Sequence, residues 1–559
     1  MTHRRSEHFH ISQLKRTYNR QTNTFTINIA YETAPTVLTQ RTKEVAEAFG
    51  LGADQTRQFT LYDNISIRIK PTDIVLITGD SGSGKSALLK ALKADLGTDA
   101  QDAKDLQINP DQPIIETLGA NTTQAIQALS QVGLNDAFLF LRPYSQLSDG
   151  QKHRYQTALL AASQKPFWIV DEFTSTLDRD TAKILAFNLQ KIARKSGRAV
   201  IAATTHKDLL RDFAPNVHIH KRYGKEITVK YHPNAKATQC SLNSQITIQQ
   251  GTTADYKALC QFHYRASRVP PPRKIFTLKR KAELCGVIVY SYPPPMTFGR
   301  SKVWKGKIKE LQNEISAISR VVIHPKYRSI GLGEKLVAET LCQAGTCCVE
   351  TVAVMAKYNP FFEKAGMQKI AESKPSRHLQ NALKQLEALG FDTALMASAS
   401  YNQQKITQTG TQPIINILTE LSAHDGSIRR RTANLKAVYP KHQEFTEKIS
   451  AHTQQELAEA LKKLCFTSQT KTYLHWKKEA EVAVDHCGST PRLRPVLQTL
   501  HSYPHPLERI TSKLRLLSPE PSQVRLVDNE AASLRKPPID RQPQRTDSHW
   551  FGNGNLSGL

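Results

Sequence analysis

Long apolar runs are missing from this sequence of 559 residues. A transmembrane helix needs about 20 consecutive, mostly apolar residues, and no stretch of the chain is both that long and that apolar. Residues 1–20 are polar and contain no apolar core, so they do not predict a secretory signal. These absences argue against a transport protein that carries its membrane domain in the same chain, although a separate membrane subunit stays open.

Paired cysteine motifs are also missing. The chain has 8 cysteines, and none of them forms a C-x-x-C pair. Neither a zinc site nor a disulfide framework is therefore predicted. Scattered, reduced thiols fit a cytoplasmic protein, and this is the predicted location.

Negative charge is scarce. The chain has 76 Lys and Arg residues against 49 Asp and Glu residues, which gives a formal net charge of +27. Such an excess attracts polyanions, and nucleic acid is the usual one. An anionic membrane surface is the rival interpretation, and a basic protein can also simply be soluble. Nucleic acid is the predicted partner.

Local sequence patterns divide the chain into several parts, as its length suggests. Alternating strand and helix signals predict two α/β segments, leucines at three- and four-residue spacing predict a helical basic region, and a tail rich in Pro and Arg predicts disorder. The predicted parts are a polar N-terminal extension (1–23), a first α/β domain (24–230), a linker (231–244), a second α/β domain (245–376), the helical region (377–490) and the tail (491–559).

A glycine loop between a strand and a helix is the most informative motif. Residues 79–86 read G-D-S-G-S-G-K-S after the apolar run 74–77, which is the P-loop pattern in its required context. Backbone N–H groups of such a loop surround the phosphates of ATP, Lys85 adds positive charge, and Ser86 offers its hydroxyl to Mg²⁺. The residues predicted to bind the nucleotide here are Gly79, Ser81, Gly82, Gly84, Lys85 and Ser86.

Acidic residues follow a second apolar strand at 167–170. Asp171, at the end of that strand, is predicted to complete the metal shell. Glu172 can orient or deprotonate the attacking water. A later predicted strand leads to His206, which is predicted to contact the γ-phosphate. The combination predicts ATP hydrolysis.

These motifs, together with L-S-D-G-Q at 147–151, resemble the ABC ATPase family. In this comparison residues 79–86 match Walker A, Asp171 and Glu172 match Walker B with the catalytic glutamate, residues 175–178 match the D-loop, and His206 matches the switch histidine. Asp149 replaces the first of the two usual signature glycines.

The resemblance also implies residues that no single motif identifies. Ser148 and Gly150 of the signature are expected to bind ATP held by a second copy, which implies an ATP-sandwiched homodimer. Gln112 is assigned to the Q-loop as a metal ligand beside Ser86 and Asp171. An aromatic residue is expected to stack on adenine, and Tyr62 is assigned to this role with Phe59 as the alternative.

The second α/β segment contains another glycine-bearing loop. A predicted strand at 318–323 leads into H-P-K-Y-R-S-I-G-L-G at 324–333 and then into a helix. Consecutive N–H groups at the start of that helix would suit a pyrophosphate, with Lys326 and Arg328 adding positive charge. A purely structural strand–turn–helix is the alternative interpretation.

The segment N-P-F-F-E-K-A-G-M at 359–367 follows, and with this loop it resembles the GNAT (N-acetyltransferase) superfamily. The resemblance implies that acetyl-CoA or another acyl-CoA binds there, and that the strand at 317–323 splays from its neighbour so that backbone amides polarise the thioester carbonyl. The residues expected to contact the cofactor are Val321, Val322, Arg328, Ser329, Gly331 and Gly333.

This sequence differs from the family at the residue expected to act as the general acid of such a transferase. Phe362 stands where many members have a tyrosine that protonates the leaving thiolate. His263 is the candidate base and Tyr264 the candidate acid. Ordinary packing of both side chains is the alternative.

The whole layout resembles ABC-type ATPases fused to a predicted acetyltransferase, whose GNAT portion is similar to the branch that includes the phage Mom protein, which modifies adenine in DNA. The predicted fold is α/β: a P-loop ABC ATPase domain, a GNAT-like domain, a helical C-terminal region and a disordered tail. The predicted function is ATP-dependent modification of an amine on DNA or RNA, with residues 429–431 contacting phosphates or forming a solvated face. The alternatives are an ATP-gated nucleic-acid- or ribosome-binding switch, and a transporter ATPase with a separate membrane subunit.

Overall fold

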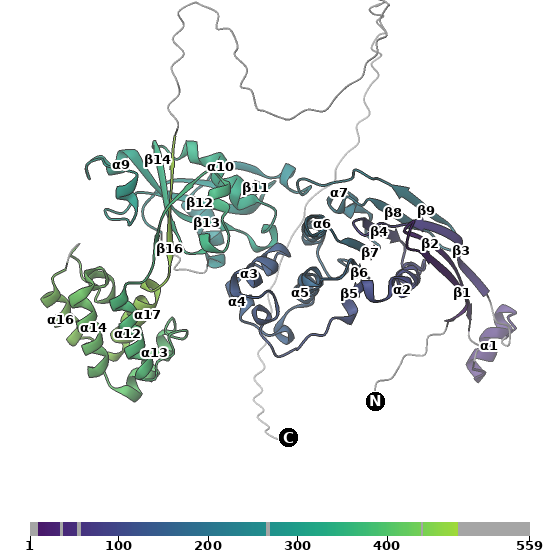
Figure 1. Cartoon of the computed structure of the whole chain (residues 1–559), viewed down its shortest axis with the longest axis horizontal. Helices are drawn as coiled ribbons and strands as arrows, with labels where there is room; N and C mark the ends of the chain where they lie inside the picture. The colour runs from purple at the N-terminus through teal and green to yellow at the C-terminus, as the bar shows by residue number, and fades with distance from the viewer. Residues whose placement is uncertain (1–8, 34–36, 53–57, 264–268, 438–439, 479–559) are drawn as a thin grey trace, which may run out of the picture. The chain divides into compact units, whose positions relative to one another are not determined.

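Three β-sheets organise the part of the chain that the structure describes (Figure 1). The structure is a computed structural model, and all its described residues belong to one compact unit, Met1–Glu481. The described residues are 9–33, 37–52, 58–263, 269–437 and 440–478. The predicted tail at 491–559 lies outside them.

The first sheet is antiparallel and three-stranded. Its strands, in spatial order, are β1 (Phe9–Asn19), β2 (Thr24–Thr33) and β3 (Gln58–Arg68). The ring of Tyr18 on β1 stacks on Phe25 of β2 with 4.2 Å between ring centroids. β1 lies within the segment predicted as a polar extension, because an antiparallel strand with one solvated face can be polar and still pair.

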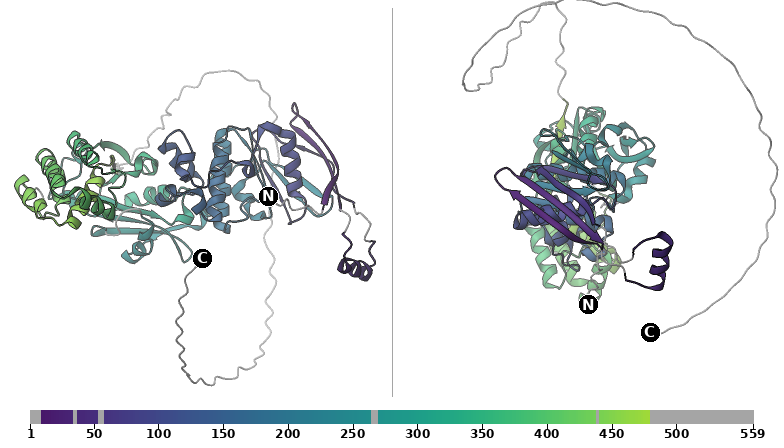
Figure 2. Two further views of the ribbon diagram at one scale, coloured as in Figure 1. Left: turned by 90° about the horizontal axis from the view of Figure 1, so that it is seen from below. Right: turned by 90° about the vertical axis from the view of Figure 1, so that its right-hand side faces the viewer.

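A short helix, α1 (Gln40–Phe49), connects β2 to β3. It begins at a capping box formed by Thr39 and Thr42 and ends at Gly50, which has a φ of +61°. None of its residues is buried, and Figure 2 draws it apart from the sheets. The helix is therefore held by its caps rather than by core packing.

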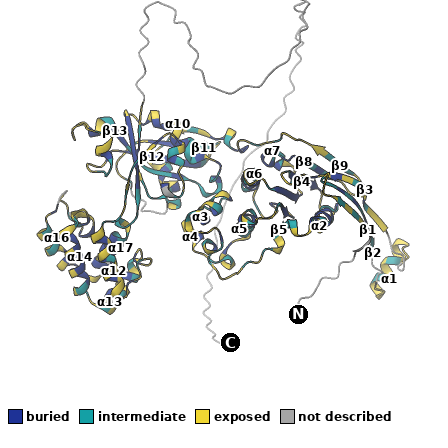
Figure 3. Ribbon diagram, viewed as in Figure 1, coloured by how far each residue is buried: buried dark blue, intermediate teal, exposed yellow. Residues whose placement is uncertain are grey.

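The second sheet contains the predicted P-loop. Its strands, in spatial order, are β5 (Ala100–Asp102), β6 (Phe167–Val170), β7 (Ala199–Thr204), β4 (Ile74–Gly79), β8 (Val217–Lys221) and β9 (Ile227–Tyr231). All pairs are parallel except β8–β9. Every residue of β4, β6 and β7 is buried, as is usual for a parallel sheet covered on both faces (Figure 3).

The helices of this region follow the strands and cover the sheet. They are α2 (Lys85–Leu96), α3 (Thr122–Gln131), α4 (Ala137–Phe140), α5 (Asp149–Ala162), α6 (Arg179–Ser196) and α7 (Leu210–Phe213). Because β4, β6 and β7 are parallel neighbours, the loops that follow them meet at one edge of the sheet. That edge collects the predicted catalytic residues.

The third sheet is mixed and seven-stranded. Its spatial order is β10 (Thr247–Gln250), β11 (Pro272–Arg280), β12 (Glu283–Ser291), β13 (Ile315–Ile323), β14 (Cys348–Ala353), β16 (Lys471–Lys477) and β15 (Gln368–Ser373). Its helices are α8 (Thr253–Leu259), α9 (Leu311–Glu314), α10 (Leu332–Thr340) and α11 (Phe361–Lys364). The parallel pair β13–β14 joins only from Ile315–Cys348 to Ala317–Glu350.

Six helices lie between β15 and β16 in the sequence: α12 (Arg377–Ala388), α13 (Ala399–Thr409), α14 (Gln412–His424), α15 (Arg429–Thr432), α16 (His442–Ser450) and α17 (Gln454–Thr467). They have their own hydrophobic core. The predicted helical region is wrong at β16, which pairs with β14 and β15. The helices are an insertion into the third sheet rather than a region that follows it.

The segment predicted as a linker (231–244) is packed. Cys240 and Leu242 are buried in the core of the third sheet. The backbone N–H and the hydroxyl of Ser241 each donate a hydrogen bond of 2.6 Å to the buried carboxylate of Asp212. Ile184 and Phe187 of α6 belong to the same core, so the P-loop region and the third sheet share hydrophobic packing.

Candidate nucleotide-binding site

The glycine loop leaves β4 and enters α2 with backbone angles that favour glycine. Gly84 has a φ of +99° and caps α2. A Cβ atom on Gly79 would stand 2.1 Å from the carbonyl oxygen of Lys221 on the neighbouring strand β8. The loop can therefore keep this path only with glycine at these positions.

The side chain of Lys85 forms hydrogen bonds with the backbone of the glycine loop. Its Nζ donates to the carbonyl oxygens of Gly79 at 2.9 Å and Asp80 at 2.7 Å. Burial lowers the pKa of Lys85, while Asp171, Asp80 and Glu172 act in the opposite direction. The ammonium is thus positioned among the backbone groups that would surround phosphates.

Ser86 and Asp171 meet although they lie far apart in the sequence. The Ser86 hydroxyl donates to Asp171 Oδ1 at 3.1 Å, and the Glu172 backbone N–H donates to the same oxygen at 3.0 Å. A hydroxyl beside a carboxylate is a donor set that Mg²⁺ takes. Ser86 and Asp171 therefore fit a magnesium ion, which would neutralise phosphate charge when bound there.

Lys104 is a residue of this site that the sequence motifs do not identify. It follows β5, and its Nζ lies 2.8 Å from Asp171 Oδ2. Burial alone would lower the pKa of Lys104, but the hydrogen bond and the charge of Asp171 raise it overall. The sequence feature that could have identified Lys104 is its position just after β5, which pairs with β6 in the structure.

Gln112, assigned as a metal ligand, is exposed just before the isolated bridge at Pro113. The side chain that contacts Asp171 from the segment after β5 is that of Lys104. The role of Gln112 at the metal stays a prediction.

Tyr62 does not have the exposure that stacking on adenine requires. Its side chain is 0% exposed, and its hydroxyl donates to the carbonyl of Gly84 at 2.9 Å. Tyr62 supports the loop from below, and its assignment as an adenine contact is wrong. Phe59, which is 45% exposed, stays the alternative for the adenine contact.

Tyr223, which the sequence analysis missed, is exposed, and its hydroxyl donates to the carbonyl of Ser81 at 2.7 Å.

The two predicted catalytic residues follow neighbouring strands. Glu172 comes directly after Asp171, is exposed, and has a φ of +51°. His206 comes after β7, and its backbone N–H donates to the Thr204 hydroxyl at 3.2 Å. Burial and the nearby Arg179 lower the pKa of His206, while Asp208 opposes them, so the neutral imidazole is favoured.

The predicted signature begins helix α5. Ser148 is exposed and caps the helix in a capping box with Gln151. Arg154 of the same helix donates to the carbonyl of Gly150 at 3.2 Å and to that of Gly133 at 3.0 Å. Ser148 and Gly150 are thus presented at the open start of a helix, where a partner's nucleotide could reach them.

The second predicted site gathers around the loop between β13 and α10. Arg328 donates to the carbonyls of Ile323, Asn135 and Phe262 at 2.9, 2.8 and 3.1 Å. Burial lowers its pKa, with Asp136 opposing. Arg328 therefore fixes the loop through backbone carbonyls, and its contact with a cofactor stays a prediction.

The other residues of this set are placed as follows. Val322 is buried and Val321 half-buried on β13, Ser329 accepts a hydrogen bond of 2.9 Å from Asn188, Gly331 caps α10 with a φ of +84°, and Gly333 lies in its first turn. His263 follows Phe262, whose ring lies 4.9 Å from that of His324. Tyr264 lies outside the described residues.

A P-loop between a buried parallel strand and a helix, with a lysine inside it and a serine–carboxylate pair beside it, defines a P-loop nucleotide triphosphatase. Comparison with known proteins narrows this class. No protein-family model matches the chain. The cytochrome c biogenesis ATP-binding export protein CcmA of Yersinia pestis is 31% identical over 182 residues, which cover 27% of this chain and 80% of that protein. The Brucella abortus protein of the same name is 28% identical over 184 residues, 28% of this chain and 82% of the relative. The chain belongs to the family of ATP-binding cassette (ABC) ATPases.

The solved structures that match part of the chain include ATP-binding cassettes. A dimeric ATP-binding cassette in a post-hydrolysis state, bound to ADP and Pi, is 20% identical and covers 31% of this chain and 92% of its own, with a TM-score of 0.27. CbiO1 from Clostridium perfringens, part of an ABC transporter complex, is 18% identical over 30% of this chain and 81% of its own, with a TM-score of 0.26. In the part of the chain that the structure describes, no helix is long and apolar enough to cross a bilayer.

Proposed function

We propose that this ABC ATPase drives a GNAT-like domain, which binds an acyl-CoA and transfers the acyl group to an amine on nucleic acid. The observation that carries the proposal is the parallel strand pair β13–β14, which separates beside a glycine-bearing loop. The strands pair from Ile315 to Ala317 and no further, although β13 continues to Ile323. Strands that part in this way leave backbone N–H groups available to a thioester carbonyl.

The start of α10 supports a pyrophosphate at the same place. Gly331 caps this helix without any side-chain hydrogen bond, and no atom lies within 4 Å of where its Cβ would be. The first N–H groups of a helix carry partial positive charge and bind anions. Because the Arg328 guanidinium already donates to carbonyl groups, the backbone amides at the start of α10 would balance most of the negative charge of the pyrophosphate.

The spatial order of the third sheet gives further support. The sheet has a single parallel pair, β13–β14, and β13 is the strand that the resemblance to GNAT proteins expects to splay from its neighbour. Phe362 is buried against Phe361 and cannot donate a proton. We keep His263 as the proposed base and Tyr264 as the proposed acid, with Glu172 and His206 as the proposed catalytic residues of ATP hydrolysis.

The nucleic-acid part of the proposal rests on charge. The chain carries a net charge of +27, and its inserted helices form a cavity of about 620 Å³ whose lining includes three basic side chains and one aromatic side chain. Arg430, Arg431, Lys463 and Phe466 are among its lining residues. Arg429 is different, because its guanidinium donates to the carbonyls of Ser422 and Pro440. Basic groups beside an exposed ring suit a single strand, with contacts to phosphate and base.

The test is binding and transfer of an acyl group with a matched pair of glycine variants. Gly331→Glu places a negative charge where the pyrophosphate would lie, and Gly366→Glu places the same residue at another left-handed glycine with a φ of +96° and open surroundings. Each substitution costs about 1–2 kcal/mol in backbone strain. We expect only Gly331→Glu to abolish calorimetric binding of acetyl-CoA and the appearance of an acylated nucleoside. Wild-type protein that binds no acyl-CoA would contradict the proposal.

A second candidate is the ATPase subunit of a transporter with a separate membrane subunit. The name of the relatives, ATP-binding export protein, favours it. Recovery of the tagged chain with an integral membrane protein after detergent extraction would support this candidate. A third, an ATP-gated nucleic-acid- or ribosome-binding switch, would show acyl-CoA binding without any transfer, and the buried Phe362 favours it.

A further inference from the structure

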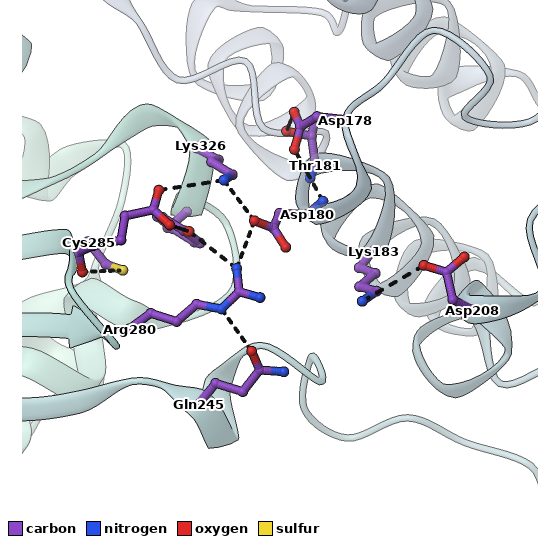
Figure 4. Close-up of polar contacts among 11 residues, drawn as sticks. Asp178, Asp180, Thr181, Lys183, Asp208, Gln245, Arg280, Cys285 and Lys326 are labelled. Carbon is purple, nitrogen blue, oxygen red and sulfur yellow. Dashed lines mark hydrogen bonds and ion pairs between the residues drawn. The ribbon is translucent and has the colours of Figure 1, made fainter. Parts of the chain in front are cut away.

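Helix α6, which follows the predicted D-loop, contacts the region of the third sheet through the side-chain carboxylate of Asp180. Asp178 caps α6, and its Oδ1 accepts hydrogen bonds of 3.1 Å from the backbone N–H groups of Asp180 and Thr181. The side chain of Asp180 lies on the other side of this turn (Figure 4). Its Oδ2 is 2.7 Å from Arg280 Nη1 and 2.7 Å from Lys326 Nζ. Arg280 belongs to β11, and Lys326 belongs to the loop that leads to α10.

This cluster is partly shielded from water. The side chains of Asp180, Arg280 and Lys326 are 16%, 20% and 28% exposed. Burial alone would raise the pKa of Asp180, but hydrogen bonds from Lys326 and Arg280 lower it overall. Two cations therefore share the Asp180 carboxylate, and Lys326 also lies 3.5 Å from Glu283 Oε1. Loss of the Asp180 carboxylate would remove the 2.7 Å ion pair that each cation makes with it.

The same loop is tied to the ATPase region at two further points. Arg328 donates to the carbonyl of Asn135, in the turn whose Gly133 carbonyl is bound by Arg154 of the signature helix. Ser329 accepts its hydrogen bond from Asn188 of α6. Three residues of the short loop 324–331 thus contact the region that would bind and hydrolyse ATP.

The segment between the proposed catalytic glutamate and Asp180 is suited to transmit a change. It is a short turn in which Glu172 and Thr174 have φ angles of +51° and +66°. Non-glycine residues in the left-handed region carry strain of order 1–3 kcal/mol each, which the surrounding structure holds in place. A rearrangement around Glu172 would act on the start of α6, where Asp180 lies.

We propose that Asp180 is a positioning residue for the loop 324–331, so that the nucleotide state of the ATPase sets the geometry of the anion-binding amides at the start of α10. The identity of the anion rests on the proposed function, as a pyrophosphate of acyl-CoA. The coupling between Asp180 and the loop does not rest on the proposed function, because it concerns the geometry of the loop and not the identity of its ligand. Asp180 acts through Lys326 and Arg280 and touches neither ATP nor acyl-CoA.

The experiment is hydrogen–deuterium exchange on the full chain. We use Glu172→Gln as the parent, because loss of the proposed catalytic carboxylate should let it hold ATP without hydrolysis. We follow the backbone amides of residues 324–333 with and without Mg·ATP. We expect ATP to change their exchange in the parent and to leave it unchanged after Asp180→Asn. The matched control is Asp208→Asn, since Asp208 pairs with Lys183 and Arg179 inside the ATPase region, and it should keep the change.

A second variant tests whether a loss of response in Asp180→Asn comes from the broken contact or from a folding defect. Lys326→Met removes the cation on the loop, with its contacts to Asp180 and Glu283, and leaves the pair of Asp180 with Arg280 in place. It should also lose the ATP-dependent change in exchange. Both variants should bind ATP as the parent does. The proposal is overturned if ATP leaves these amides unchanged in the parent, or if Lys326→Met keeps the full response.

Calorimetry separates this inference from the proposed function. In the parent, ATP should change the affinity for acetyl-CoA, whereas Asp180→Asn should bind acetyl-CoA with one affinity in both nucleotide states. Failure of every form of the protein to bind acetyl-CoA would sink the proposed function, and the exchange measurement would still decide the role of Asp180. Binding that responds to ATP equally in parent and Asp180→Asn would overturn the inference alone.

Discussion

Asp171 is the residue at which the parts of the nucleotide site meet. One of its oxygens accepts from the Ser86 hydroxyl and from the Glu172 backbone, and the other faces the Lys104 ammonium. A carboxylate that is held by a lysine in this way has to exchange that partner before it can contact a metal ion. The ion pair with Lys104 therefore competes with magnesium for Asp171.

Replacement of Lys104 by glutamine should change the magnesium requirement. Without the ammonium, Asp171 Oδ2 is open, so the Mg²⁺ concentration for half-maximal ATP hydrolysis should fall about two- to fivefold, as expected of an exposed ion pair worth about 0.5–1 kcal/mol. Metal titration of fluorescent-nucleotide binding gives a second readout. Lys104→Arg keeps the charge and should behave as the wild type. An unchanged magnesium dependence in Lys104→Gln would show that the two cations do not compete.

At the residue scale, the sequence is most informative where a motif includes its own context. A buried strand precedes the motifs of Lys85, Ser86 and Asp171, and the structure brings Ser86 and Asp171 to 3.1 Å, while their roles stay predictions. Tyr62 was misassigned because its exposure depends on which face of β3 it occupies. Lys104 was missed because its contact exists only once β5 pairs with β6, and no local pattern reports that pairing.

At the scale of elements, α5 and the turn after β6 are joined by a histidine. The N–H of Thr174 donates to His153 Nε2 at 3.3 Å, so the imidazole is neutral and acts as an acceptor. Burial, followed by the charge of Arg154, lowers the pKa of His153 to about 4. Protonation of His153 would remove the bond that links the signature helix to the D-loop turn.

The pH dependence of stability follows from this shift. The unfolded chain takes up a proton on His153 near its ordinary pKa of 6.5, whereas the folded chain resists until about 4. The contribution of His153 is therefore fully present above pH 6.5 and is lost as the pH falls toward 4. His153→Gln keeps an acceptor without titrating, so its melting temperature should fall less steeply over this range. Parallel melting curves for variant and wild type would contradict this account.

Elements whose partners are distant in sequence were the ones that the sequence analysis missed. β16 follows the leucine pattern of α17 directly, but its partner β14 lies far upstream, since Tyr473 meets Glu350 across a separation of 123 residues. β1 is polar and gains its place by pairing with β2. The P-loop strand and its helix, in contrast, are neighbours in the sequence, and a local pattern suffices to predict them.

At the scale of the whole molecule, the distribution of positive charge matters more than its sum. Arg430 and Arg431 line a cavity on the inserted helices, whereas Arg429 of the same run is committed to backbone carbonyls. A run of arginines that looked uniform in sequence is thus divided by the fold into a structural residue and two exposed ones. Only the exposed pair can contact phosphates.

Charge reversal at Arg430 and Arg431 should weaken binding to single-stranded nucleic acid. Since each phosphate contact contributes about 0.7 to the slope of log affinity against log salt, the double variant should lower that slope by about 1.4. The control reverses Arg377 and Lys384, which are exposed on α12 and change the net charge equally. Fluorescence anisotropy at several salt concentrations measures both. Equal losses in the two double variants would mean that net charge alone, and not the cavity, attracts the strand.

The assembly of two copies is the last consequence of the site. We expect two copies to dimerise on ATP, because Ser148 of the predicted signature is exposed at the start of α5. Glu172→Gln should slow hydrolysis and hold the dimer, so light scattering with Mg·ATP should give twice the protomer mass of 62.7 kDa. Adding Ser148→Arg should return the protein to a monomer that still binds ATP, because the block lies on the face toward the partner's nucleotide. A doubled mass that persists in this double variant would mean that the two copies associate through another surface, and the coupling from Asp180 would then have to act within a single chain.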